Sequence, residues 1–530
     1  MSYDYIIAGG GLSGCVLASR LSTALPNLKI ALIETGPDSQ RNEAIASPGN
    51  AWMITPDYYH NYETLPQKHL DNRNVAIKTG RALGGGSAVN YGGWTRGDRS
   101  GYDEWARVVG DSRWSYDELL PYFKRAETYP LPNLEDQHGY EGPIKPSRGD
   151  RGYLLKEDVL EAMKSTGLQE NPDANGGDIR GVARLVESWD EGRRTFAAGD
   201  YDLGNVEVLA GMSVQKVVVE GGVAKGVVLG DGRVLEARRE VVVSCGALRT
   251  PQVLMLSGIG PRKELEKLGI EVLVDSPHVG KNLHDHGMVA FWYKLRHPEQ
   301  GLAIGSEKFM ANPRNLEGNP MDWMINTGIS DAETKKAAEI DGKDTSRRDD
   351  IEITCIYLAA PTSPFPPPPM DGTHISVSVI GIHATSRGSV SLSSTDPNDL
   401  PLIDPAYLAT EHDRAVIRTG AKIVAKMMES PAGQRISTGE TPPGPFSPLT
   451  SKTSDAEIDE RARACIFTAY HPAGSAAMGT VVDAECRVKG MKGLRVVDAS
   501  IMPVSIGAHL QASLYGVAER AAQMIIDAAK

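Results

Sequence analysis

The most informative ten residues of this chain read Tyr5-Ile6-Ile7-Ala8-Gly9-Gly10-Gly11-Leu12-Ser13-Gly14. Residues 5–8 form a short apolar run, which predicts a buried strand. Apolar residues then recur at helical spacing from Val16 to Leu25, just before Pro26, and predict a helix. A second apolar run covers residues 30–33 and ends at Glu34. Together these features predict a βαβ unit.

The spacing Gly9-x-Gly11-x-x-Gly14 between a strand and a helix is typical of dinucleotide binding. Such a site needs a tight turn, a bare backbone beside the pyrophosphate, and close packing of helix on strand. Glu34 lies 20 residues beyond Gly14, where an acid can accept hydrogen bonds from ribose hydroxyls. The acid also argues against the 2′-phosphate of NADP. A glycine-rich turn that binds nothing is disfavoured because strand, helix and acid occur together.

Length and composition set outer limits on the protein. The chain has 530 residues, which predicts two to four domains, and its 56 glycines make about 10.6% against a usual ~7%. The net charge is −12 without a Lys/Arg run, so neither nucleic acid nor an anionic membrane is an expected partner. No apolar stretch could span a bilayer, no signal peptide precedes Tyr5, and the five cysteines are scattered. These features predict an intracellular, cytoplasmic protein.

The rest of the chain divides by pattern. Residues 205–245 hold short β-branched runs with Asp231-Gly232 as a turn, which predicts a small meander. Residues 291–460 differ in character, with a charged stretch at 335–350 that predicts a solvated, mobile loop, an alternating strand near 375–379 and a helix over 415–428. A strand at 494–497 and a helix at about 512–529 close the chain. We therefore predict a second domain inserted within the first.

A second glycine cluster covers residues 80–90 and continues through Gly92, Gly93 and Trp94. So many glycines indicate close backbone contact with a large cofactor. The apolar residues Leu83, Val89 and Trp94 make a solvated linker a poor interpretation of this segment.

Residues 80–94 and 246–260 resemble the two signatures of the glucose–methanol–choline (GMC) oxidoreductase family. Residues 279–286, 470–475 and 497–503 are similar to further family segments. The resemblance implies an α/β (α+β) fold, with a Rossmann-type FAD-binding domain and an inserted substrate domain built on an antiparallel sheet packed by helices. It implies the division into an FAD-binding domain of residues 1–150, 192–290 and 461–530, and a substrate-binding domain of residues 151–191 and 291–460.

The resemblance also implies which residues hold FAD. It places the first glycines at the pyrophosphate, Glu34 at the adenosine ribose, Val214 at the adenine and Asp498 at the ribityl or pyrophosphate region. The full set of expected cofactor-binding residues is Gly9, Gly11, Leu12, Ser13, Gly14, Glu34, Arg81, Gly85, Ser87, Asn90, Val214, Asp498, Ala499 and Gln511. Some relatives carry a His that bonds covalently to FAD where this chain has Val89, so the expected FAD is non-covalent.

His471 and His509 are the expected catalytic pair. Alcohol oxidation needs a base for the hydroxyl proton, and a neutral histidine can accept it near pH 7. A second polar group must hold the substrate oxygen, and the family places Asn or His at position 509. No metal site is expected, because His284-x-His286 has no evident third ligand.

The resemblance implies FAD-dependent oxidation of a small-molecule alcohol, primary or aryl, to an aldehyde or ketone, with O2 or a quinone-like electron acceptor. Two alternatives of the same fold stay open: a hydroxynitrile-lyase-like enzyme with structural FAD, and a light-driven decarboxylase, which expects Asn rather than His at 509. The sequence does not indicate the oligomeric state.

Overall fold

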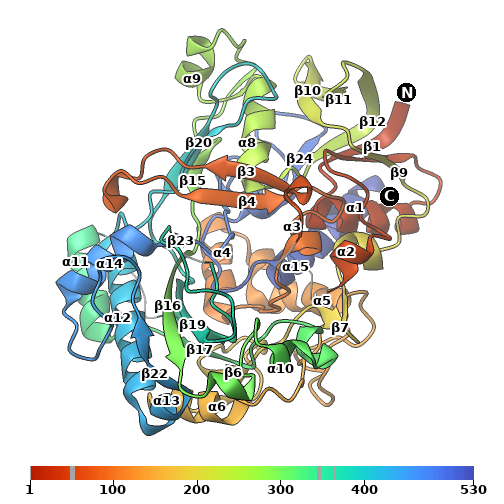
Figure 1. The fold of residues 1–530 in the computed structure, drawn as a ribbon. Helices are drawn as coiled ribbons and strands as arrows, with labels where there is room; N and C mark the ends of the chain where they lie inside the picture. The colour runs from red at the N-terminus through yellow and green to blue at the C-terminus, as the bar shows by residue number, and fades with distance from the viewer. Residues whose placement is uncertain (1, 48–53, 343–347, 362–363) are drawn as a thin grey trace.

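The computed structural model describes residues 2–47, 54–342, 348–361 and 364–530, arranged around two large sheets. In Figure 1 the N-terminal sheet lies in the upper part of the molecule and the second sheet in the lower part. This arrangement confirms the predicted fold class, a Rossmann-type unit combined with a mainly antiparallel sheet covered by helices.

The first sheet has a parallel centre in the order β9-β2-β1-β12-β24. These strands are Glu207–Ala210, Ile30–Glu34, Ser2–Ala8, Val234–Val243 and Leu494–Val496. Strand β1 pairs with a strand on each side, and its apolar run is buried on both faces, as is typical of parallel sheets. The antiparallel strands β10 (Val214–Glu220) and β11 (Val223–Leu229) extend the sheet beside β12. The meander is therefore confirmed for β10–β12, whereas β9 pairs with β2.

Three helices pack together beside this sheet. Helix α1 (Leu12–Ala24) follows the glycine-rich turn, and α15 (Gln511–Ala529) packs against both α1 and α5 (Tyr116–Ala126). Glu519 of α15 is fully buried and forms ion pairs with Arg20 and Arg125. The last helix is thus held to the first.

The second sheet runs β22-β16-β19-β18-β17-β6-β5, with β23 also paired to β16. Its strands are Ser437–Thr441, Gly287–Leu295, His374–Gly381, Ile351–Ile356, Trp323–Thr327, Gly181–Arg184, Glu170–Asn171 and Phe467–Thr468. Helix α12 (Glu411–Glu429) packs on β18 and β19 and contacts α11 (Asp331–Asp341), α13 (Pro431–Ile436) and α14 (Asp455–Cys465). Helix α6 (Lys156–Lys164) covers the sheet near β17.

The remaining helices and strands lie outside the two large sheets and the helices already described. They are the helices α2 (Glu43–Ala46), α3 (Gly86–Val89), α4 (Arg99–Val109), α7 (Ala197–Asp200), α8 (Gly246–Leu256), α9 (Arg262–Lys267) and α10 (Glu307–Met310), and the strands β3 (Tyr59–Glu63), β4 (Ala76–Gly80), β7 (Trp189–Asp190), β8 (Arg193–Arg194), β13 (Ile259–Gly260), β14 (Val274–Asp275), β15 (Lys281–Leu283), β20 (Gly388–Ser391) and β21 (Leu402–Asp404).

The prediction of a solvated loop over residues 335–350 is wrong for its described parts. Residues 335–341 belong to α11, whose start is fixed by a capping box between Ser330 and Glu333. Asp350, at the other end, is 2% exposed. A charged composition masked both the helix and the buried carboxylate, and residues 343–347 lie outside the described residues.

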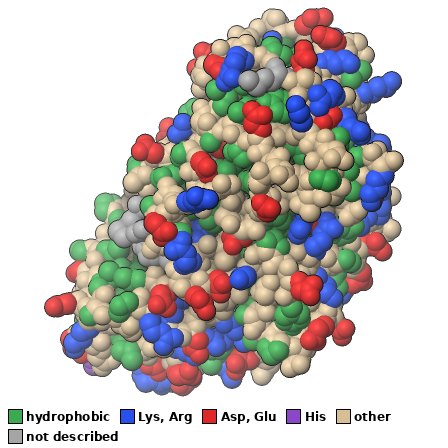
Figure 2. All heavy atoms as spheres, turned by 90° about the vertical axis from the view of Figure 1, so that its right-hand side faces the viewer, with side chains coloured by type: hydrophobic (Ala, Val, Ile, Leu, Met, Phe, Trp, Pro, Cys, Tyr) green, Lys and Arg blue, Asp and Glu red, His purple; other side chains and the backbone are tan. Residues whose placement is uncertain are grey.

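The surface agrees with the charge pattern of the sequence. On the face drawn in Figure 2, acidic and basic side chains of the described residues are interspersed, with no broad area of positive charge. Across the described ranges, no helix has both the length and the apolar character that a membrane crossing needs.

Candidate active site

The turn between β1 and α1 requires glycine at Gly9 and Gly14. Gly9 has φ +106°, and a Cβ there would lie 2.3 Å from the carbonyl oxygen of Ser244, the residue that follows β12. A Cβ on Gly14 would lie 2.0 Å from the carbonyl oxygen of Gly9, so α1 packs directly on the turn. On Gly11 the nearest atoms to a Cβ would be 4.0 Å away, which leaves open space on that side. The turn is closed toward the protein and open where a cofactor would lie.

Glu34 ends β2 beside this turn. Its carboxylate accepts hydrogen bonds from the backbone N–H groups of Gly10, at 3.0 Å, and Gly36, at 2.7 Å. Burial raises the pKa of Glu34 to about 7, against the opposing effect of these hydrogen bonds. A carboxylate held this way can accept a hydrogen bond from a diol at the end of the strand.

The second glycine cluster forms α3. Gly85 precedes this helix with φ +54°, and a Cβ there would approach the Cα of Gly11 to 2.7 Å, so the two glycine segments touch. Gly86 is exposed between buried neighbours, and apart from those neighbours no atom of a described residue lies within 4 Å of a Cβ built there. The helix therefore presents bare backbone to an open space.

Asp498 lies at the end of the first sheet's last strand. Its buried carboxylate accepts hydrogen bonds from the N–H of Gly246 (2.8 Å), the hydroxyl of Thr250 (2.6 Å) and the N–H of Ser500 (2.7 Å). Burial raises the pKa of Asp498 despite these contacts. The carboxylate thereby joins α8 to the segment that leads to the C-terminal helix.

The other predicted cofactor residues surround the same space. Leu12 and Ser13 form the first turn of α1, Val214 begins β10, and Ala499 follows Asp498. Gln511 begins α15, donates to the carbonyl of Gly93 at 2.7 Å and accepts from the side chain of Asn90 at 3.1 Å. Arg81 is turned to the carbonyl of Asp57, at 3.1 Å. The role of each as a cofactor ligand stays a prediction.

These residues fit a dinucleotide cofactor. Two carboxylates lie at or beyond the carboxyl ends of parallel strands of the first sheet: Glu34 ends β2, and Asp498 lies two residues after β24. Among the described residues, no atom beyond the chain neighbours lies within 4 Å of a Cβ built on Gly86 or Gly246, so the backbone at both glycines borders unfilled space. Bare backbone N–H groups, a helix N-terminus and a strand-end acid are the chemistry that a pyrophosphate and a ribose require.

The structure brings the two predicted catalytic histidines together. The rings of His471 and His509 lie 5.0 Å apart between centroids and nearly perpendicular, at 85°. Both side chains are partly exposed although protein surrounds them. Nε2 of His471 and Nδ1 of His509 make no hydrogen bond with any described residue, so both atoms are available to a substrate.

His471 is oriented by His286, one of the two histidines that were not expected to bind a metal. Nδ1 of His286 lies 3.0 Å from Nδ1 of His471, and Nε2 of His286 lies 3.0 Å from the hydroxyl of Ser505. If the serine accepts from His286, the ring of His286 accepts from Nδ1–H of His471, and Nε2 of His471 carries the lone pair. Burial, and then the neighbouring His509, lower the pKa of His471 well below its usual range.

Asp285 holds the backbone on which His471 stands. Its carboxylate accepts hydrogen bonds from the N–H of His471 at 2.9 Å and from the hydroxyls of Tyr407 and Thr468 at 2.5 Å each. The preceding Tyr470 has φ +64°, unusual for a bulky residue. A buried anion and a strained residue at one position are typical of a preorganised active site.

His509 has a carboxylate partner that sequence reasoning missed. Its Nε2 lies 2.7 Å from Oε1 of Glu352 on β18, and its backbone N–H donates to the hydroxyl of Thr95 at 2.7 Å. Burial lowers the pKa of His509, but the charge of Glu352 and the hydrogen bond to it outweigh burial and raise the pKa above its usual value. No local signal marks Glu352, which lies in an ordinary apolar strand 157 residues earlier.

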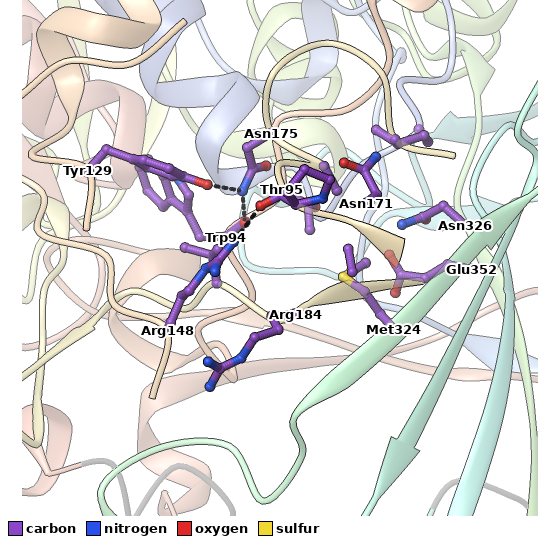
Figure 3. Close-up of a pocket in the computed structure, with 16 residues that line it drawn as sticks. Trp94, Thr95, Tyr129, Arg148, Asn171, Asn175, Arg184, Met324, Asn326 and Glu352 are labelled. Atoms are coloured by element: carbon purple, nitrogen blue, oxygen red, sulfur yellow. Dashed lines mark hydrogen bonds between the residues drawn. The ribbon is translucent and has the colours of Figure 1, made fainter. Parts of the chain in front are cut away.

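A polar pocket lies on the far side of Glu352, lined by residues of both parts of the molecule (Figure 3). Asn326 and Glu352 border it on one side, and Arg148 and Arg184 lie across it. Its free volume of about 10 Å³ matches a single water molecule. The pocket is therefore too small for an alcohol substrate, but it has room for a water molecule beside Glu352, the partner of His509.

Three tyrosines, Tyr59, Tyr91 and Tyr470, are close enough to one another for their charges to interact, and Tyr470 directly precedes His471. Tyr91 is 38% exposed and Tyr470 is 40% exposed, yet burial raises the pKa of both. The neighbouring Tyr470 and Tyr59 raise the pKa of Tyr91 further. Surrounding protein combined with solvent exposure indicates that these rings border an internal space. We call Tyr59, Tyr91 and Tyr470 the tyrosine cluster.

His284 and His286 do not act as a pair. Nδ1 of His284 lies 3.0 Å from the carbonyl oxygen of Asn282, whereas His286 faces His471. Among the described residues, the candidate metal group is instead three carboxylates, Asp98, Asp178 and Asp349, of which Asp349 is paired with Arg180.

Comparison with known proteins gives a consistent result. The family models described as GMC oxidoreductase match residues 3–288 and 384–518. A GMC-type oxidoreductase of Aspergillus aculeatus, acuG, is 41% identical over 99% of this chain and 99% of its own length.

Two solved structures are similar throughout. A pyridoxine 4-oxidase from Mesorbium loti has 30% identity and a TM-score of 0.85, over 98% of each chain. A fungal aryl-alcohol oxidase has 26% identity and a TM-score of 0.85, over 99% of each chain.

Proposed function

The chain belongs to the GMC oxidoreductase family, and from this premise we propose that it oxidises a primary alcohol carrying an aromatic group, with His471 as the base. It is an FAD-dependent oxidoreductase that acts on alcohol-type donors. The same proposal assigns the first sheet to the cofactor and the second sheet to the substrate, and keeps the division of the chain predicted from the sequence.

The contrast between the two histidines carries this proposal. The pKa of His471 is held low, so its ring is neutral and can accept a proton at pH 7. The charge of Glu352 and the hydrogen bond to it raise the pKa of His509, which shifts its ring toward the protonated form, in which Nδ1–H can donate to an oxygen. A neutral base and a donor stabilised in its protonated form, with ring centroids 5.0 Å apart, match the needs of an alcohol that loses its hydroxyl proton.

Separate groups of residues would bind the cofactor, accept the proton and hold the substrate oxygen. Gly9 to Gly14, Glu34, Asp498 and the α3 segment would hold FAD, which when bound supplies the acceptor for the hydride that leaves the carbinol carbon. Nε2 of His471 takes the hydroxyl proton, and Nδ1–H of His509 holds the oxygen as it becomes negative. The carbon–oxygen bond becomes a carbonyl, so the product is an aldehyde.

The tyrosine cluster supports an aromatic substrate. Aromatic rings at the border of the proposed substrate space favour another ring by about 0.5–1.5 kcal/mol beyond simple burial. Two structural relatives are named as oxidases of pyridoxine and of aryl alcohols. We also propose that FAD is bound non-covalently, because Val89 offers no nucleophile, and that the electron acceptor is O2 or a quinone.

The test is anaerobic mixing of the purified holoenzyme with a panel of aryl and aliphatic alcohols while the visible flavin absorbance is followed. Rapid bleaching by aryl alcohols, faster than by aliphatic ones of equal size, supports the proposal. Flavin that stays oxidised across the panel would favour the lyase alternative. Denaturation with acid should release the flavin into solution, and re-oxidation by oxygen or by a quinone identifies the acceptor.

A further inference from the structure

Arg194, at the end of β8, is a buried arginine that contacts only neutral groups. It is 4% exposed, and its Nε donates to the carbonyl of Ile45 at 3.0 Å. Its Nη1 donates to the side-chain oxygen of Asn90 at 2.7 Å and lies 3.3 Å from the carbonyl of Ser87. Its guanidinium carbon lies 4.3 Å from the ring centroid of Trp189. Nothing in the sequence singled out this residue.

Two other deeply buried arginines of the chain have carboxylate partners. Arg96 pairs with Glu127 at 2.6 Å, with both side chains 1% exposed, and Arg151 pairs with Glu187. Arg194 forms no ion pair with a described carboxylate, and its buried Nη2 makes no hydrogen bond with any residue that the structure describes. Burial lowers the pKa of Arg194 to about 9, which still leaves it charged at pH 7. A buried charge of this kind is costly unless an anion compensates it.

The contacts of Arg194 place its charge behind the proposed FAD site. Ser87 and Asn90 belong to the segment of α3 whose backbone borders open space at Gly86. Asn90 continues the network to Gln511, at 3.1 Å, two residues after His509. A positive charge without a carboxylate partner among the described residues thus lies one hydrogen bond from two predicted cofactor residues, Ser87 and Asn90.

We infer that Arg194 is a positioning residue of the proposed FAD site, which orients Asn90 and whose charge favours the reduced over the oxidised form of bound FAD. The inference rests on the proposed function. In that reaction the alcohol loses a proton to His471 and a hydride to FAD, so the cofactor gains one negative charge. The buried positive charge of Arg194 compensates that negative charge. If it thereby favours reduction of bound FAD, the protein must also bind reduced FAD more tightly than oxidised FAD, because the two equilibria are linked.

The test compares two variants and one control as FAD-loaded proteins. Arg194→Gln keeps a hydrogen-bond donor for Asn90 but removes the charge, and Arg194→Lys keeps the charge but loses the planar fork. Arg193→Gln is the matched control, because Arg193 is 61% exposed in its side chain and pairs with Glu43 at the surface. The readout is the midpoint potential of bound FAD, measured by equilibrium reduction against a reference dye without any alcohol.

We expect Arg194→Gln to weaken the preference for reduced FAD about tenfold, a potential about 30 mV lower for a two-electron couple. Arg194→Lys should retain most of the wild-type potential, and Arg193→Gln all of it. A wild-type potential in Arg194→Gln, or an equal fall in Arg194→Lys, would overturn the inference. If Arg194→Gln does not bind FAD, the midpoint potential of Arg194→Lys is compared with that of the wild type. A potential about 30 mV lower in Arg194→Lys would then overturn the inference. Failure of the wild-type chain to bind FAD would instead count against the proposed function.

Discussion

The glycine turn at the end of β1 and the histidine pair at positions 471 and 509 serve one proposed reaction but are built in opposite ways. The turn works through the absence of side chains: Gly9, Gly14 and Gly85 allow backbone to meet backbone, all within short segments of sequence. The histidine pair works through side chains from distant parts of the chain: His471 and His509 lie in loops, Glu352 lies on β18 of the second sheet, and His286 directly precedes β16. Changes in the first region should therefore affect cofactor binding, and changes in the second should affect rate and pH dependence.

Replacement of His471 should give the largest effect and the clearest separation of the two regions. His471→Ala removes the proposed base, so the rate of flavin reduction by an alcohol should fall about 10³-fold. The FAD content should stay at the wild-type level, because His471 touches none of the glycine segments. Stopped-flow absorbance under anaerobic conditions measures both quantities. Reduction within tenfold of the wild-type rate would show that another group takes the proton.

The reciprocal change in the glycine turn should spare the chemistry and weaken the cofactor. In Gly14→Ala the new Cβ would lie 2.0 Å from the carbonyl of Gly9, so the backbone must shift. Strain of about 2 kcal/mol is expected from such a shift, equivalent to about thirtyfold weaker FAD binding. Fluorescence titration of the apoprotein with FAD gives the dissociation constant.

Gly101→Ala is the control for this experiment. Gly101 lies in α4, and its added Cβ would meet the nearest atom, Cδ1 of Ile506, at an ordinary 3.5 Å. Its FAD affinity should match the wild type. Unchanged affinity in Gly14→Ala would mean that the turn adapts and that its glycines are not required for cofactor binding.

The same contrast explains what could be predicted from the sequence. Residues 5–14 imply β1 and α1 because apolar period, glycine spacing and the strand-end acid lie close together along the chain. The predicted helix at 415–428 became α12 for the same reason. Glu352 could not be found in this way, since its strand is buried on every residue and its function depends on a partner 157 residues away. The charged composition of residues 335–341 likewise favours a loop, whereas the capping box between Ser330 and Glu333 is a local sequence signal for the helix that forms there.

Removal of the charge at Glu352 should shift a pH profile more than a rate. In Glu352→Gln burial still lowers the pKa of His509, but the opposing charge is gone. His509 then loses its proton at lower pH, so the alkaline limb of kcat/KM should move to lower pH, with about tenfold less activity at pH 8. Glu352→Asp, which keeps the carboxylate, should restore most of the alkaline limb. A profile that does not move in Glu352→Gln would remove His509 from the proposed role.

The smallest expected effect concerns substrate choice at the tyrosine cluster. Tyr91→Leu removes a ring that borders the space beside His471, while Tyr91→Phe keeps the ring and removes only the hydroxyl. Loss of an aromatic contact of about 1 kcal/mol predicts a KM about fivefold higher for an aryl alcohol in Tyr91→Leu, with kcat nearly unchanged. Tyr91→Phe should resemble the wild type, and neither variant should alter KM for an aliphatic alcohol. Because Tyr91 is next to Asn90 in the glycine-rich segment, the FAD affinity of both variants must be measured as well. An equal rise in KM for both alcohol classes, at unchanged FAD affinity, would mean that the cluster shapes the cavity without selecting an aromatic substrate.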